Sequence, residues 1–324
     1  MHCDFKQLLC APLHRYHLAM LKRKIVFYRW LASDPQRSFD LHRVVGDLAA
    51  HITADPTFAI TRSNEVATAV EVVDVGDENN PTNVILYALR SPENRPLQWE
   101  PGQPISAIRL EDGQYPADVT HLSIFPNGYA TQDAHGYAPR PGRFSFFLRK
   151  KMREKISFEP LFTPDMIERM RHLKGRLRGA NIAFTQAEYT SGNPGGGGSL
   201  SVLWPQALRQ KVPVVRVDLS MGKFGPRDRY LDNAVDDAVF ELAENSNDQI
   251  EKLIVRGSNP QTGAIEEINL LKNRLQMEKE FAPSQGVPSL PERSEVFFAM
   301  DQAYKEFYRN GVLDQAGHAQ ILRE

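Results

Sequence analysis

The chain has 324 residues with a formal net charge of −1, and 41% of its residues are apolar and 24% charged. That composition is typical of an ordinary globular protein with room for one or two cores. No run of about 18 apolar residues occurs, so the sequence predicts no membrane-spanning helix. The only cysteines are Cys3 and Cys10. They exclude a disulfide framework and favour a reducing, cytoplasmic setting.

The first 24 residues have no sustained hydrophobic period and differ in this from the rest of the chain. Met20 precedes a basic patch and a strand-like run, so one interpretation is a start-site artefact with Met20 as the initiator. The other is a poorly ordered extension. A zinc site is a further interpretation, and its ligands would be Cys3, Cys10, His14 and His17. Their spacing, C-x6-C-x3-H-x2-H, is not a usual zinc pattern. We predict no metal and no cofactor.

Residues 25–160 predict a strand-rich domain. An apolar stripe at helical spacing between Leu41 and Ile52 predicts one helix, and Asp55-Pro56 ends it. Asn127-Gly128 is typical of a tight hairpin turn between two strands. Runs of β-branched and aromatic residues predict strands at 24–31, 66–75, 84–89, 119–125 and 129–132.

Residues 161–324 predict a mixed α/β domain that is richer in helix. Pro164 suits the first position of a helix that Thr163 begins. The Gly-rich run at 192–198 predicts a flexible loop, and it lacks the Gly-Lys-Ser/Thr of a phosphate-binding loop. Strands are expected at 180–185, 212–219 and 250–256, and helices at 229–245 and 296–308. The predicted fold class is therefore α+β, with a strand-rich N-terminal domain and a mixed α/β, helix-rich C-terminal domain.

The stretch from Arg140 to Arg178 is strongly basic, with twelve Lys and Arg residues against four acidic ones, a net charge of +8. The remaining chain carries about −9. Such polarisation favours a surface that binds a polyanion. The alternative is a set of ordinary solvated helix faces. Because the stretch spans the change from the strand-rich to the helix-rich part, we expect it to line a cleft between two domains.

The structure of the first part of this stretch stays open from the sequence. Phe144, Phe146 and Leu148 alternate as in a strand, and an extended chain would space every second cation by about 6.6 Å, close to the spacing of phosphates. A helix would instead align Arg149 with Arg153. Few aromatics accompany the charges, which favours contact with a duplex backbone over base stacking. The candidate DNA-binding residues are Arg143, Arg149, Lys150, Lys151, Arg153, Lys155, Arg171, Lys174, Arg176 and Arg178.

The sequence predicts no catalytic residues, because no serine, cysteine or acid at motif spacing completes a nucleophilic set. His121 and His135 flank the predicted hairpin and are candidates for a pair. A metal-dependent nuclease is the alternative function; Asp218, followed by Lys223, and one of the acids at 232–244 are its nearest candidates. A third hypothesis is an interaction subunit whose basic stretch docks an acidic partner.

The order of segments resembles that of RexA-like phage-exclusion sensor proteins of the lambda Rex system. It is also similar in layout to KwaB of the Kiwa antiphage defence system. The strongest local points are HLSIFPNGYA at 121–130 and ISFEPLF at 156–162. The Gly-rich loop and the acidic helix have no counterpart. The resemblance implies a cytoplasmic homodimer that binds double-stranded DNA with little sequence preference in antiphage defence, beside a membrane-protein partner encoded nearby.

Overall fold

The computed structural model of the chain describes residues 20–32, 40–63, 66–90, 97–98, 106–107, 110–111, 114–135, 138–185, 214–222, 229–244, 250–285, 287 and 289–316. The suggested zinc ligands, nearly all of the N-terminal extension and the Gly-rich loop at 192–198 lie outside these residues.

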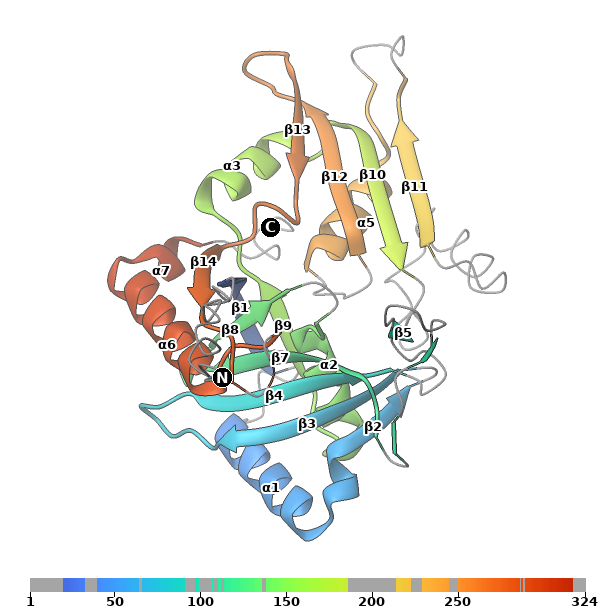
Figure 1. The fold of residues 1–324 in the computed structure, drawn as a ribbon. Helices are drawn as coiled ribbons and strands as arrows, with labels where there is room; N and C mark the ends of the chain where they lie inside the picture. Colours follow the sequence, from blue (N-terminus) through green and yellow to red (C-terminus); the bar gives the residue numbers. More distant parts are fainter. Residues whose placement is uncertain are drawn as a thin grey trace, which may run out of the picture.

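An eight-stranded antiparallel sheet, called here the large sheet, forms the lower part of the molecule (Figure 1). Along its main path it contains β14 (Gln276–Phe281), β1 (Leu21–Ala32), β8 (Tyr129–Ala134), β7 (Ala117–Ile124), β4 (Thr82–Leu89), β3 (Val66–Asp74) and β2 (Ile60–Ser63). The eighth strand, β9 (Ile156–Pro160), pairs with the second half of β1, whereas β14 pairs with its first half. A separate short ladder joins β5 (Leu97–Gln98) to β6 (Ser106–Ala107).

Helices cover both faces of the large sheet. On one face α1 (Leu41–Ala54) and α2 (Pro141–Lys151) close a core with Val26 and Tyr28 of β1. On the other face α6 (Arg293–Arg309) closes a second core with Ile25 and Phe27. Because side chains alternate along a strand, a strand buried on both faces needs a continuous apolar run, which explains residues 25–28. The short helices η1 (Pro56–Ala59) and α7 (Val312–Gln315) complete this part.

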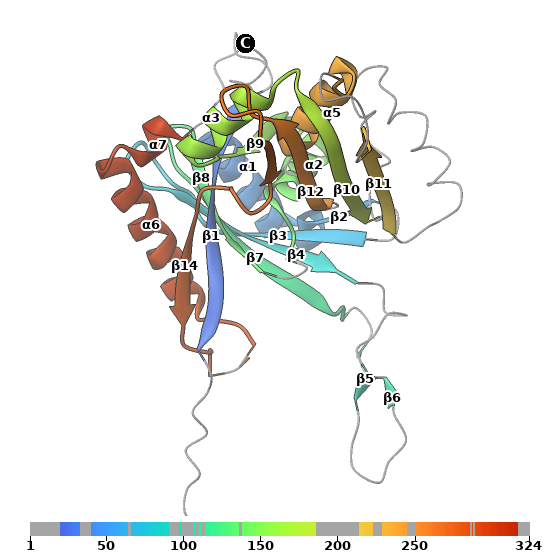
Figure 2. The same cartoon turned by 90° about the horizontal axis from the view of Figure 1, so that it is seen from above.

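A second, four-stranded antiparallel sheet, the small sheet, has the order β11-β10-β12-β13. Two helices pack on one of its faces and enclose a third core, which includes Ile167, Ile182 and Val239. Figure 2 shows both helices on the same side of the strands. The elements are α3 (Pro164–Leu173), β10 (Leu177–Thr185), β11 (Val214–Ser220), α5 (Asn233–Glu244), β12 (Ile250–Ser258) and β13 (Ile265–Asn269).

Two chain segments connect the sheets and are hydrogen-bonded to each other. The outgoing segment follows β9, and the returning one precedes β14. Leu275 donates its N–H to the Leu161 carbonyl at 2.7 Å, and Thr163 donates to the Asn273 carbonyl at 3.2 Å. The chain thus leaves the large sheet at residue 160, where the domain boundary is expected, and later returns to it with β14 and α6.

The α+β fold class predicted from the sequence is confirmed. The strand-like pattern at 144–148 is misleading, because these residues belong to α2. Phe144, Phe147 and Leu148 are fully buried, at the i, i+3, i+4 spacing of one helix face. Pro141 occupies the first turn, where a proline favours helix formation. No helix within the described residues is long and apolar enough to cross a membrane.

Candidate functional site

The C-terminal end of α2 presents a group of cations, called here the α2-end group. Two aromatic rings support it. The Arg149 guanidinium and the Lys150 ammonium lie 5.5 and 5.7 Å from the centre of the Phe146 ring, and the Lys151 ammonium lies 4.7 Å from that of Phe58. Such contacts hold long cationic side chains without neutralising them. The group consists of Arg149, Lys150, Lys151, Arg153 and Lys155.

Among the described residues, no carboxylate lies within ion-pair distance of any member of this group, whereas other surface cations have such partners. Lys22 pairs with Glu280 at 3.3 Å and Lys305 with Asp301 at 2.6 Å. The helix dipole favours cations in the last turn of α2 without any ligand. That explanation does not extend to Arg153 and Lys155, which follow the helix.

Arg153 has a positive φ of 59°, and it is the one non-glycine residue with a positive φ among those described. The left-handed conformation costs an ordinary L-residue about 1–2 kcal/mol, and the chain therefore places an arginine where glycine would be favoured. Arg153 directly follows the C-cap residue of α2, where a left-handed residue commonly ends a helix, and the Glu154 N–H donates to the Leu148 carbonyl at 3.4 Å. The other described positions with positive φ are Gly128, Gly175, Gly222, Gly263 and Gly311.

A second group of predicted contacts lies where α3 turns into β10, and is called here the α3–β10 group. The turn is held by Gly175, whose φ is 70° and whose N–H donates to the Asp236 carboxylate at 2.7 Å. The Arg178 guanidinium donates to the Arg229 carbonyl at 2.9 Å. The group consists of Arg171, Lys174, Arg176 and Arg178.

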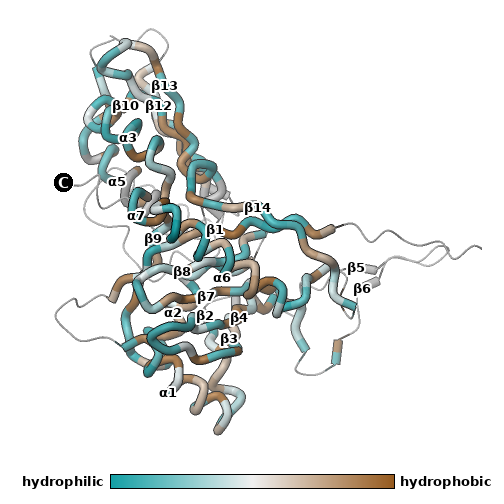
Figure 3. Tube along the Cα trace, turned by 90° about the vertical axis from the view of Figure 1, so that its left-hand side faces the viewer, coloured by the Kyte–Doolittle hydropathy of each residue, from teal (hydrophilic) through white to brown (hydrophobic). Residues whose placement is uncertain are grey.

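The predicted DNA-binding residues belong to two parts of the fold. The α2-end group belongs to a helix of the large sheet, and the α3–β10 group belongs to the small sheet (Figure 3). Arg143 lies in the first turn of α2, at the opposite end of that helix from the α2-end group. Folding thus divides one basic stretch of sequence into two groups of cations on different elements.

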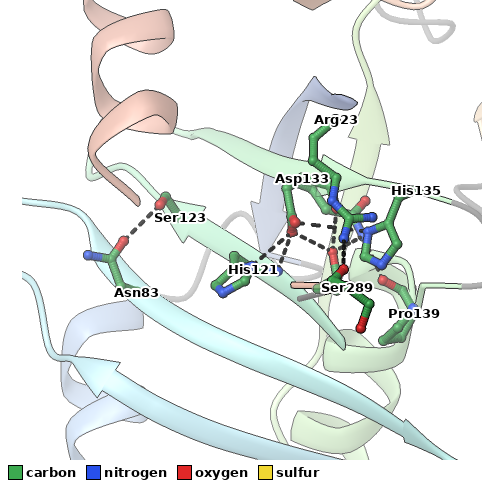
Figure 4. Close-up of polar contacts among 10 residues, drawn as sticks. Arg23, Asn83, His121, Ser123, Asp133, His135, Pro139 and Ser289 are labelled. Carbon is green, nitrogen blue, oxygen red and sulfur yellow. Dashed lines mark hydrogen bonds and ion pairs between the residues drawn. The ribbon is translucent and has the colours of Figure 1, made fainter. Parts of the chain in front are cut away.

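A buried polar cluster lies on the α6 side of the large sheet (Figure 4). The β7–β8 ladder ends at the pair Leu122–Gln132. Beyond that pair the Asp133 carboxylate accepts hydrogen bonds from the backbone N–H of His121 and from the Thr120 hydroxyl, the latter at 2.9 Å. The carboxylate therefore continues the contact between the two strands after the backbone ladder has ended.

Both histidines that flank the hairpin face this carboxylate. Nδ1 of His121 lies 3.2 Å from one oxygen of Asp133, and Nδ1 of His135 lies 3.9 Å from the other. Burial lowers the pKa of His135 below its usual range, and Asp133 opposes that shift. Burial also lowers the pKa of Arg23, again opposed by Asp133. The Arg23 guanidinium donates to the Ser289 carbonyl at 3.1 Å and so connects the cluster to the loop before α6.

The sequence indicated the histidine pair but missed Asp133 and Arg23. The signal for Asp133 was the hairpin itself, since a turn at 126–128 places residue 133 beside residue 121. A histidine–carboxylate pair is able to move a proton. The nearby Ser123 is not paired with it, because its hydroxyl donates to the Asn83 side-chain oxygen at 2.7 Å. The contacts of the cluster connect β7, β8 and the loop before α6.

The acids proposed for a nuclease are not brought together. Val217 packs into the core that contains α5, so Asp218, the next residue of β11, points to the opposite face of the small sheet. There it accepts a hydrogen bond from Asn181 at 3.2 Å. Lys223 lies outside the described residues. Within the described part of the chain, no three His, Cys, Asp or Glu residues are arranged to hold a metal.

Comparison with known proteins adds no relative. No family model and no curated protein matches the chain. The resemblance to RexA-like and KwaB proteins in segment order therefore stays a prediction, and the function has to be inferred from the residues of this chain.

Proposed function

We propose that this protein binds double-stranded DNA through its phosphate backbone, without reading base sequence, and that the α2-end group makes the principal contacts. One observation carries the proposal. Five cations gather around one helix end without an ion-pair partner among the described residues, and one of them occupies a position that elsewhere holds glycine.

Phosphate contact fits the chemistry of this group. Each duplex phosphate that a Lys or Arg neutralises releases counterions, and this release drives binding that is independent of sequence. The rings of Phe146 and Phe58 lie beneath the cations, at 4.7–5.7 Å from them. Rings in that position are occupied by the protein's own side chains, which disfavours stacking on the bases of a single strand.

The cellular setting is part of the same proposal. The resemblance of the segment order to that of RexA-like and KwaB proteins supports a cytoplasmic homodimer that acts in antiphage defence or phage exclusion. It also supports a membrane-protein partner encoded nearby. No observation on the described residues favours the nuclease alternative, since its candidate acids lie on opposite faces of the small sheet.

The experiment compares two variants that lose the same charge. The first carries Arg149→Gln, Lys150→Gln, Arg153→Gln and Lys155→Gln, and leaves Lys151 on its Phe58 ring. The matched control carries Lys22→Gln, Lys24→Gln, Lys305→Gln and Arg309→Gln. In a gel shift with a duplex of arbitrary sequence, the control should bind like the unaltered protein.

The α2-end variant should lose the shift at moderate salt because it lacks phosphate contacts. Circular dichroism on both variants establishes that they are folded. A folded α2-end variant that binds the duplex as tightly as the control does would sink the proposal.

A further inference from the structure

The backbone that carries the α3–β10 group is held in place by three hydrogen bonds. The backbone N–H of Lys174 donates to the Met170 carbonyl at 3.0 Å, and that of Gly175 donates to the Asp236 carboxylate at 2.7 Å. The backbone N–H of Ser258 donates to the Arg176 carbonyl at 3.2 Å. A surface fixed in this way loses little conformational entropy when a ligand binds. The exposed Arg171 and Arg176 have no ion-pair partner among the described residues.

The two basic groups are well separated along the chain's path. β9 and α3 follow one another between them. Five strand residues span about 16 Å, and ten helical residues span about 15 Å. Figures 1 and 3 agree in placing α2 beside the large sheet and α3 beside the small sheet.

Acidic side chains lie between the two groups along the chain. Asp165 and Glu168 are exposed on the N-terminal half of α3. A duplex that ran along α3 from one group to the other would bring its phosphates past these two carboxylates, and like charges repel. The interruption favours a separate duplex at each group over one duplex that spans both.

We propose that one chain binds two duplexes at once, one at the α2-end group and one at the α3–β10 group, and so bridges separate DNA segments. This inference depends on the proposed function and adds to it a second, independent site. Bridging requires no new chemistry, since both contacts are phosphate contacts. It differs from simple binding in that it needs both groups on the same chain.

The test uses a biotinylated duplex on beads, the full chain, and a free fluorescent duplex. The unaltered protein should retain the fluorescent duplex on the beads. A variant of the second group, Arg171→Gln with Lys174→Gln and Arg176→Gln, should still bind a single duplex in a gel shift. Its capture of the second duplex should fall at least tenfold at protein concentrations at which the chain is monomeric, because a dimer with two α2-end groups would bridge without the α3–β10 group. The control with Lys22, Lys24, Lys305 and Arg309 replaced by Gln should capture as well as the unaltered protein.

The outcomes separate the two claims. If the α3–β10 variant bridges as well as the unaltered protein, two chains with one site each suffice, and the two-site inference is wrong while DNA binding stands. Failure of the unaltered protein to capture the second duplex, despite binding the first, overturns the inference in the same way. If the unaltered protein binds no duplex at all, the proposed function fails as well.

Discussion

Arg153 combines an unfavourable backbone conformation with an exposed charge, and substitutions separate the two properties. Arg153→Gly should leave the free energy of unfolding unchanged or raise it by up to about 1 kcal/mol, because glycine adopts positive φ freely. Arg153→Val should lower it by about 1–2 kcal/mol, because a β-branched residue is strained there. Both should weaken DNA binding. Urea denaturation measures the stabilities, and a stable Val variant would contradict the assigned conformation.

Asp236 is a buried carboxylate that lies behind the α3–β10 turn. Burial is the main reason that its pKa is raised to about 6, and Asp232 and Asp237 raise it further; the Gly175 N–H opposes the shift. The folded state therefore binds this proton more tightly than the unfolded chain does. The stabilisation that protonation gives is complete below about pH 4 and is lost as the pH rises through about 6.

Asp236→Asn removes the charge and keeps an oxygen that accepts the Gly175 hydrogen bond. At pH 7.5 this variant should be more stable than the unaltered protein by about 1–3 kcal/mol. At pH 4 the two should be nearly equal, because the carboxyl group is then protonated. Urea denaturation at both pH values provides the measurement. Equal stability at pH 7.5 would show that the carboxylate is compensated in the folded state.

At the scale of single elements, α2 is where the sequence pattern was ambiguous. The run 144–148 fits a strand if positions 144, 146 and 148 face inward, and it fits a helix if 144, 147 and 148 do. The structure has the second arrangement, with Phe147 fully buried and Phe146 beneath the cations. Pro141 was the local signal that favoured the helix. By contrast, β1 was predictable because four consecutive apolar residues require burial on both faces.

The two phenylalanines give a direct test of this helix. Phe147→Ala should lower the free energy of unfolding by about 3–5 kcal/mol, because it opens a cavity in the core. Phe146→Ala should cost less than about 1.5 kcal/mol, because its ring is only half-buried. Phe146→Ala should also weaken DNA binding by removing the support for Arg149 and Lys150. The reverse order of the two stabilities would restore the strand interpretation.

At the scale of the whole molecule, local pattern could not predict which distant segments meet. The sequence Gln276–Phe281 is polar and short, and nothing in it indicates that β14 returns to the large sheet beside β1. The same limit applies to the basic stretch. Its net charge was evident from the sequence, but its division into two groups depends on α2 and α3 packing against different sheets. Asp133 was within reach of the hairpin register, whereas Arg23 came from a distant strand.

The net charge of the chain is near zero, so DNA affinity has to come from local clusters of cations and should depend strongly on salt. The most direct measurement is the dependence of the DNA dissociation constant on salt concentration. It should be determined by fluorescence anisotropy on two duplexes of unrelated sequence, for the unaltered protein, the α2-end variant and the matched control.

We predict equal affinities for the two duplexes and a steep log–log slope for the unaltered protein and the control. In the α2-end variant the slope should fall by about three to four, roughly one for each phosphate that its four replaced cations no longer neutralise. A slope that is the same in all three proteins, or an affinity that depends on the duplex sequence, would contradict backbone binding by the α2-end group.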